Sequence, residues 1–110
     1  MASTPANRKL FISNLIGFMS QYGFDGVDLD WEYPGAEDRG GIPEDGANLT
    51  KLLKEMKQAM GRRYIVTFTA PTSYWYLRHF DIKSSAGAAD WINLMSYDLH
   101  GYVSALFPRK

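Results

Sequence analysis

The sequence predicts an α/β fold in which helices alternate with parallel strands. Apolar residues recur at helical spacing in two strong segments and one weaker one, and segments rich in β-branched and aromatic residues alternate with them. The last of these strand segments, Trp91 to Tyr97, is apolar on both faces. Strands of this kind, separated by helices, indicate parallel pairing with crossover connections that bury the sheet beneath helices.

The first half of the chain predicts one helix, one strand and a long loop. A helix is expected from about Pro5 to Gln21, because Thr4 is a good N-cap and proline suits the first helical position. Gly23 is expected to end this helix. The first strand should run from Asp25 to Tyr33, where charged and apolar residues alternate. A loop dense in glycine, proline and charge follows from Pro34 to Gly46.

The second half predicts two further helix and strand pairs. A helix from about Ala47 to Met60 has apolar residues on one face and lysines on the other. The second strand is expected from Tyr64 to Ala70, which is rich in β-branched and aromatic residues. Pro71 to Phe80 should form a loop or short helix, and Asp81 to Ala89 a weaker helix, before the third strand.

The composition favours one small globular domain whose binding site is local. The chain has 110 residues, 45% of them hydrophobic, and its twelve acidic residues balance twelve basic ones. This balance provides no net field for a nucleic acid or an anionic membrane. The chain has no cysteine, no apolar run near the ~20 residues of a membrane helix, and no visible signal peptide. The sequence itself therefore predicts no particular location and no oligomeric state.

Three acids at alternate positions form the most informative feature of the chain. Asp28, Asp30 and Glu32 lie within FDGVDLDWEYP and should point to one face of the first strand, about 6 to 7 Å apart. In a covered parallel sheet they would face a barrel interior or a crevice at the strand's carboxyl end. Crowding in such a poorly solvated place raises carboxyl pKa values, so one acid can stay protonated. Glu32, the last and longest, is the predicted general acid.

Two other interpretations of the acid row are open. One is a half-exposed antiparallel strand whose acidic face is simply in water. A calcium loop of the EF-hand type beginning at Asp28 would need glycine at its sixth position and glutamate at its twelfth, where this chain has Tyr33 and Arg39. The spacing therefore predicts no metal. Asp25 has the opposite parity to the row, and we expect it to serve the strand's entry.

Two motifs carry a resemblance to a known family. The segment from Asp25 to Pro34, DGVDLDWEYP, resembles the DxxDxDxE signature of family 18 glycoside hydrolases, the chitinases. Met95-Ser-Tyr97-Asp98 resembles the MxYD segment on a later strand of the same family. The amino-acid sequence from Thr69 to Asp81, TAPTSYWYLRHFD, most resembles the sequences of fungal chitinases. The resemblance spans residues 1–101 as a partial catalytic domain and leaves residues 102–110 as a divergent C-terminal tail.

The resemblance implies a (β/α)8 TIM barrel with its active site at the C-terminal ends of the strands. A complete barrel takes ~250 residues, so this chain would supply about three βα units, with strands four to six of the barrel. The first and third strands would each lack a parallel neighbour. The implied activity is hydrolysis of β-1,4-linked N-acetylglucosamine in chitin or chito-oligosaccharides, with retention and with no cofactor. The family's extracellular location is a further implication.

The family mechanism implies a role for each acid, because the substrate's own acetamido oxygen is the nucleophile. Glu32 would protonate the departing sugar, and Asp30 would orient the acetamido N–H and stabilise the positive charge that develops. Asp28 would share a proton or a hydrogen bond with Asp30. Tyr97 would donate its hydroxyl to the acetamido group. The remaining substrate-binding candidates are Met95 on the pocket floor, Asp98 at the distorted sugar, and Tyr33 and Trp75 beside the groove.

Alternatives remain for these residues and for the whole chain. Met95, Tyr33 and Trp75 could serve packing instead of substrate binding. The chain could also be a chitin-binding, lectin-like protein or an inactive truncated fragment of a chitinase. Lectins of this family typically lose the acid glutamate, and this chain retains Glu32, which favours an enzyme.

Overall fold

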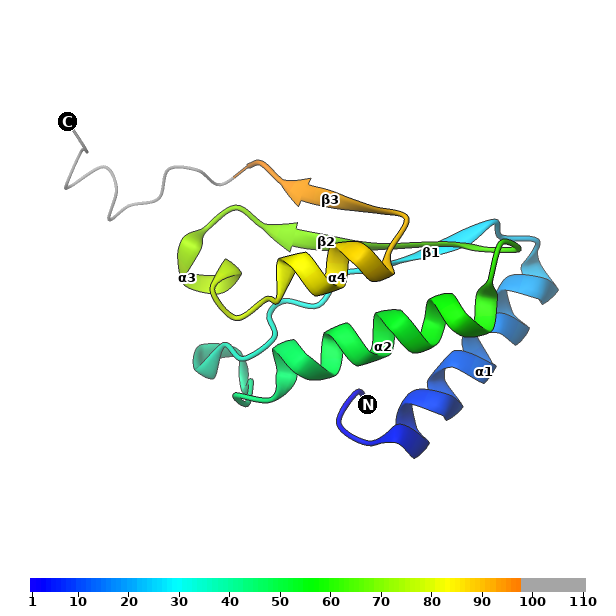
Figure 1. The fold of residues 1–110 in the computed structure, drawn as a ribbon, viewed down its shortest axis with the longest axis horizontal. Coiled ribbons are helices and arrows are strands. Elements are labelled where there is room, and N and C mark those ends of the chain that lie inside the picture. The colour runs from blue at the N-terminus through cyan, green and yellow to red at the C-terminus, as the bar shows by residue number, and fades with distance from the viewer. Residues whose placement is uncertain (98–110) are drawn as a thin grey trace.

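A computed structural model of the chain describes residues 1–97 (Figure 1). Helices and strands alternate in the expected order. The elements are α1 (Pro5–Tyr22), β1 (Gly26–Leu29), the 3-10 helix η1 (Glu37–Arg39), α2 (Asp45–Met60), β2 (Ile65–Pro71), α3 (Tyr74–Leu77), α4 (Ile82–Ala88) and β3 (Trp91–Met95). Among residues 1–97, none of these helices combines the length and the apolar character needed to cross a membrane.

Both ends of α1 have the caps that the sequence predicts. The Thr4 side chain accepts a hydrogen bond from the Asn7 amide at 3.2 Å, and Pro5 occupies the first turn. Gly23 adopts a left-handed conformation, with φ of 72°, and its amide donates to the Met19 carbonyl. This conformation is strained for any residue with a Cβ, so glycine ends the helix here.

The three strands form one parallel sheet in the order β1-β2-β3. Asp28 lies opposite Thr67, and Thr69 lies opposite Asn93. The predicted parallel pairing is therefore confirmed. Within residues 1–97, β1 and β3 each have a strand neighbour on one side only, as the family resemblance implied.

The hydrophobic core lies between the sheet and the helices on one of its faces (Figure 1). On β2, Val66, Phe68 and Ala70 are completely buried, and so are Leu53 and Met56 on α2. Helix α1 packs along α2, and α4 is joined to α2 by hydroxyl groups. The opposite face of the sheet carries no helix from the described residues, so its side chains remain available for chemistry (Figure 1).

Two strands are shorter than the sequence predicts. β1 ends at Leu29 instead of Tyr33, and β3 ends at Met95 instead of Tyr97. The pairing of β1 with β2 stops at Leu29 opposite Phe68, and the chain then leaves the sheet. The expectation that β3 would be covered on both faces is wrong for the described part of the chain. β3 is an edge strand, and its Leu94 is 64% exposed.

Candidate active site

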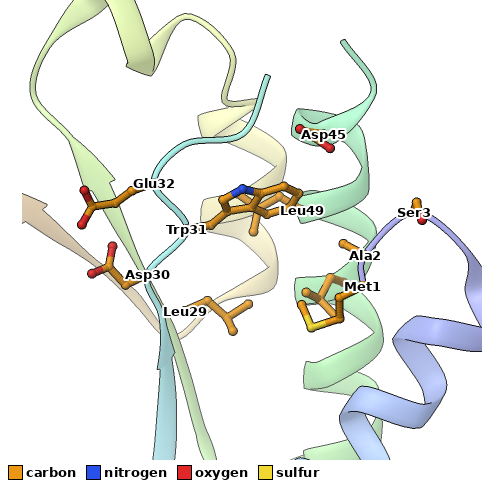
Figure 2. A pocket seen from close by; sticks show the side chains of 10 residues that line it. Met1, Ala2, Ser3, Leu29, Asp30, Trp31, Glu32, Asp45 and Leu49 are labelled. Carbon is orange, nitrogen blue, oxygen red and sulfur yellow. The ribbon is translucent and has the colours of Figure 1, made fainter. Parts of the chain in front are cut away.

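The acids of the DxDxE row lie along β1 and the segment that leaves it. Asp28 belongs to β1, whereas Asp30 and Glu32 follow the end of the strand. In Figure 2 the carboxylates of Asp30 and Glu32 lie on one side of this segment, and Trp31 lies on the other, toward Leu49 of α2. The alternation of the sequence therefore continues beyond the last strand pair and keeps these two acids together.

Asp28 is held by side chains from both other strands. One carboxylate oxygen accepts hydrogen bonds from Thr67 Oγ1 at 2.6 Å and Asn93 Nδ2 at 2.9 Å, and the other accepts from Thr69 Oγ1 at 2.6 Å. Burial, the largest single influence, acts to raise the pKa of Asp28, but the three hydrogen bonds together outweigh it and lower that pKa. Asp28 is therefore a carboxylate whose oxygens are directed by three donors and whose pKa lies below its ordinary value.

Thr67, Thr69 and Asn93 are site residues that the motifs did not indicate. Thr67 and Thr69 occupy alternate positions in the otherwise apolar segment YIVTFTA. This alternation was the signal in the sequence that both side chains lie on the same face of the strand. Their partnership with Asp28 depends on the register of strands far apart in the sequence, with Thr67 opposite Asp28 and Thr69 opposite Asn93. A single sequence does not specify such a register, so the polar ladder across the open face could be found only in the structure.

Asp30 differs from Asp28 in its electrostatics. Burial, followed by the charges of Glu32 and Asp28, raises the pKa of Asp30. The rise in carboxyl pKa that crowding predicts is therefore present at Asp30. At Asp28 the hydrogen bonds lower the pKa instead. The row is more solvated than expected within residues 1–97, because all three acids are exposed on the open face of the sheet. The burial that acts on the pKa of Asp28 and of Asp30 is therefore only partial.

The residues after Glu32 form a loop that is tied to α2. The peptide bond between Glu32 and Tyr33 is cis. The carboxylate of Asp45, in the first turn of α2, accepts hydrogen bonds from the Gly35 amide at 3.2 Å and the Ile42 amide at 2.9 Å. One buried side chain therefore holds both ends of the loop. The loop is ordered beside the acids.

The two substrate-binding candidates on β3 and α3 have different environments. Met95 is 9% exposed at the end of β3, and its carbonyl accepts a hydrogen bond from Thr72 Oγ1 at 2.9 Å. Trp75 on α3 is 59% exposed, and the Arg78 guanidinium lies 4.0 Å from the centroid of its ring. Trp75 is accessible to a ligand, whereas Met95 packs within the chain.

Three other predicted residues lie at the ends of strands or beyond them. Asp25 precedes β1, and its carbonyl accepts a hydrogen bond from the Ile65 amide at 2.9 Å, which agrees with a place at the strand's entry. Tyr97 lies two residues after β3 and is 66% exposed. Asp98 and the C-terminal tail, residues 102–110, lie outside the described residues.

A pocket of about 450 Å³ lies beside the acid row, on the helix side of the chain (Figure 2). Leu29, Trp31 and Leu49 contribute to its lining, together with the first residues of the chain. Asp30 and Glu32 border it, but their carboxylates point away from it (Figure 2). The pocket is therefore separate from the open face. Within residues 1–97, no group of three or more acidic or histidine side chains is placed to hold a metal ion.

Comparison with known proteins places the chain among glycoside hydrolases. The model of the family described as glycosyl hydrolases family 18 matches residues 1–109. The chain belongs to this family.

Named relatives and a solved structure agree with this assignment. The chain is 44% identical over 102 residues to a protein named probable chitinase LysM18, and 41% identical over 103 residues to one named secreted chitinase LysM12. Both are from Penicillium expansum, and the matches cover 89% and 90% of this chain. The structure of a group IV chitinase from Ostrinia furnacalis in complex with allosamidin aligns with a TM-score of 0.85, at 32% identity over 92% of this chain.

This chain spans a small part of each of these proteins. It covers 7% of each Penicillium relative and 28% of the Ostrinia chain.

Proposed function

We propose that this chain carries the catalytic acid row of a chitinase that cleaves β-1,4-linked N-acetylglucosamine with retention. The observation that carries the proposal is the placement of Asp30 and Glu32 on one side of the segment leaving β1 (Figure 2). Asp28 is ordered beside them on the open face of the sheet by Thr67, Thr69 and Asn93. The named chitinases among the relatives support the choice of substrate.

Each acid has a separate task in the proposed reaction. The substrate's acetamido oxygen attacks the anomeric carbon and forms an oxazolinium ion, while Glu32 gives its proton to the oxygen of the departing sugar. Water then opens the ion, and Glu32 takes a proton from that water. Asp30 accepts a hydrogen bond from the acetamido N–H and stabilises the positive charge that develops as the oxazolinium ion forms. Tyr97 donates its hydroxyl to the acetamido group and holds the nucleophile in place.

The electrostatics of Asp28 and Asp30 suit these tasks. The raised pKa of Asp30 lets this carboxyl group carry a proton at a higher pH than an ordinary aspartate. Asp28 is charged and has its oxygens directed by three donors, so it provides a fixed negative charge next to Asp30. A proton on Asp30 would be attracted by this charge. These two environments therefore suit a proton or hydrogen bond shared between the carboxyl groups of Asp28 and Asp30.

The proposal also covers the place of the three strands in a larger protein. We propose that they correspond to strands four to six of an eight-stranded barrel, within a partial catalytic domain over residues 1–101. The alignment with the Ostrinia chain over 92% of this chain supports a common local fold. An extracellular location is proposed with it, and the Penicillium relative named as secreted supports that location. Met95, Asp98, Tyr33 and Trp75 are proposed to border the sugar.

Hydrolysis of a fluorogenic chito-oligosaccharide by the purified chain tests this function. We expect Glu32→Gln to lower turnover by about 10²- to 10⁴-fold, because amide replacement removes the transferable proton. Glu44→Gln is the matched control, since Glu44 is an exposed glutamate before α2, outside the acid row. Circular dichroism melts of all three proteins check that the fold is equal.

Three results would contradict the proposal. Equal turnover in wild type and Glu32→Gln would remove Glu32 from the reaction. Equal loss in Glu32→Gln and Glu44→Gln would assign the effect to general damage. Binding of the oligosaccharide by the wild type without any turnover would favour the lectin-like alternative.

A further inference from the structure

The residue next to the proposed acid packs against the segment that follows β2. The rings of Tyr33 and Tyr76 are stacked, with centroids 4.0 Å apart and planes inclined by 20°. Tyr76 belongs to α3, and both side chains are half-buried. Burial, followed by the charge of the Glu32 carboxylate, raises the pKa of Tyr33. Tyr33 therefore lies between the proposed acid and α3.

Tyr76 also holds the middle of the loop that begins at Tyr33. Its hydroxyl donates a hydrogen bond of 2.8 Å to Asp38 Oδ2 on η1. The neighbouring Arg39 guanidinium lies 5.8 Å from the centroid of the Tyr33 ring and 3.6 Å from the Asp38 carboxylate. One side chain of α3 thus contacts the start of the loop through its ring and the middle of the loop through its hydroxyl.

The start of this loop has little freedom to move away from α3. Gly35 has a positive φ of 69°, and a Cβ there would lie 3.0 Å from Nδ1 of His79, so the backbone passes close to the segment after α3. Its amide is bound to Asp45. Tyr33 is therefore held between a ring stack on one side and an anchored glycine two residues later. Glu32 directly precedes Tyr33 in the chain.

We propose that Tyr76 is a positioning residue for Glu32, acting through its stack on Tyr33 and its hydrogen bond to Asp38. This inference rests on the proposed function for the role of Glu32 as acid. Tyr76 itself need not touch the sugar. Its effect is to keep the carboxyl group of Glu32 in the position and orientation needed to protonate the oxygen of the departing sugar. A displacement of about 1 Å at such a group lowers the rate by as much as ~10²-fold.

A double-mutant cycle on the purified chain tests the inference. Tyr76→Phe keeps the ring stack and removes the hydroxyl, whereas Asp38→Ala removes the acceptor from an exposed position. We expect each variant to lower kcat for the fluorogenic chito-oligosaccharide about tenfold and to change KM less than about twofold. The double variant should resemble the single variants, because all three lose the same contact. Tyr22→Phe is the matched control, since Tyr22 is exposed at the far end of α1.

The kinetic results separate positioning from general stability. An unchanged kcat in Tyr76→Phe overturns the inference, and so do effects that multiply in the double variant. A loss of the same size in Tyr22→Phe also overturns it. A change in KM alone would assign Tyr76 to substrate binding and would contradict the positioning role.

A second measurement needs no turnover. In a chain labelled with ¹³C at the glutamate carboxyl carbons, the Glu32 signal is identified by its absence in Glu32→Gln. We expect Tyr76→Phe to shift or broaden this signal and Tyr22→Phe to leave it unchanged. An unchanged signal in Tyr76→Phe overturns the inference. If the signal moves in a chain that has no hydrolytic activity, the positioning contact stands and the proposed function fails. If hydrolysis occurs and Tyr76→Phe changes neither readout, only the positioning inference fails.

Discussion

Successive residues of β2 belong to two different surfaces of the molecule. Val66, Phe68 and Ala70 point toward the helices and are completely buried. Thr67 and Thr69 point to the opposite face, where both donate hydrogen bonds to Asp28. Because side chains alternate along a strand, one strand stabilises the fold with one set of residues and orders a carboxylate with the other. Changes on the two faces should therefore have different consequences.

The largest effect on stability is expected on the helix-covered face. Phe68→Ala should lower the free energy of unfolding by about 3 to 5 kcal/mol, because it leaves a cavity in a completely buried site. Leu10→Ala is the control, since Leu10 is 63% exposed on α1, and its loss should stay within about 0.5 kcal/mol. Urea unfolding followed by circular dichroism gives both values. Similar losses in the two variants would show that the helix-covered face is not the core.

A smaller and pH-dependent effect is expected on the open face. The hydrogen bonds of Asp28 lower its folded pKa, so they stabilise the fold above the unfolded pKa of about 3.9. This stabilisation is lost as the pH falls through the folded pKa. We expect Asp28→Asn to be less stable than wild type at pH 7, and its melting temperature to fall less steeply below about pH 4. Parallel pH curves for the two proteins would contradict the role of these hydrogen bonds.

At neutral pH, Asp30 is expected to affect the stability of the fold in the opposite direction to Asp28. Its folded pKa is raised by burial and by the neighbouring acids, so the charged form disfavours the fold at neutral pH. This disadvantage disappears as the pH falls through the folded pKa and on below the unfolded one. Asp30→Asn should therefore not lose stability at pH 7 as Asp28→Asn does. A loss of equal size in both variants would show that the two acids share one environment.

Local signals in the sequence were enough to predict α1, α2 and α4 and the order of the strands, but not η1, which lies inside the predicted loop. Thr4, Pro5 and Gly23 determine the ends of α1 through side-chain capping and backbone conformation, which depend on neighbours in the chain. The parallel pairing also followed, because strands separated by helices have few other arrangements. The same alternation placed Asp30 and Glu32 on one side of the chain (Figure 2).

The features that were missed depend on contacts between distant segments. The acid and apolar residues alternate up to Tyr33, yet β1 ends at Leu29, because pairing needs a partner strand as well as a pattern. The lowered pKa of Asp28 comes from side chains on β2 and β3. The stack of Tyr76 on Tyr33 joins α3 to the loop after β1, and no local signal in the sequence connects these two segments. The exposure of the acid row likewise depends on how the elements of residues 1–97 pack together.

The anomer that forms first from a chito-oligosaccharide tests the central claim most directly. The claim is that the acid row lets the substrate's acetamido group attack its own anomeric carbon, with Glu32 as the acid. The acetamido oxygen displaces the departing sugar at the anomeric carbon, and water then displaces the acetamido oxygen. Two successive displacements retain the β configuration. Proton NMR of the purified chain with substrate should therefore show the β-anomer of the new reducing end before mutarotation. An α-anomer as the first product would mean direct displacement by water and would contradict the account.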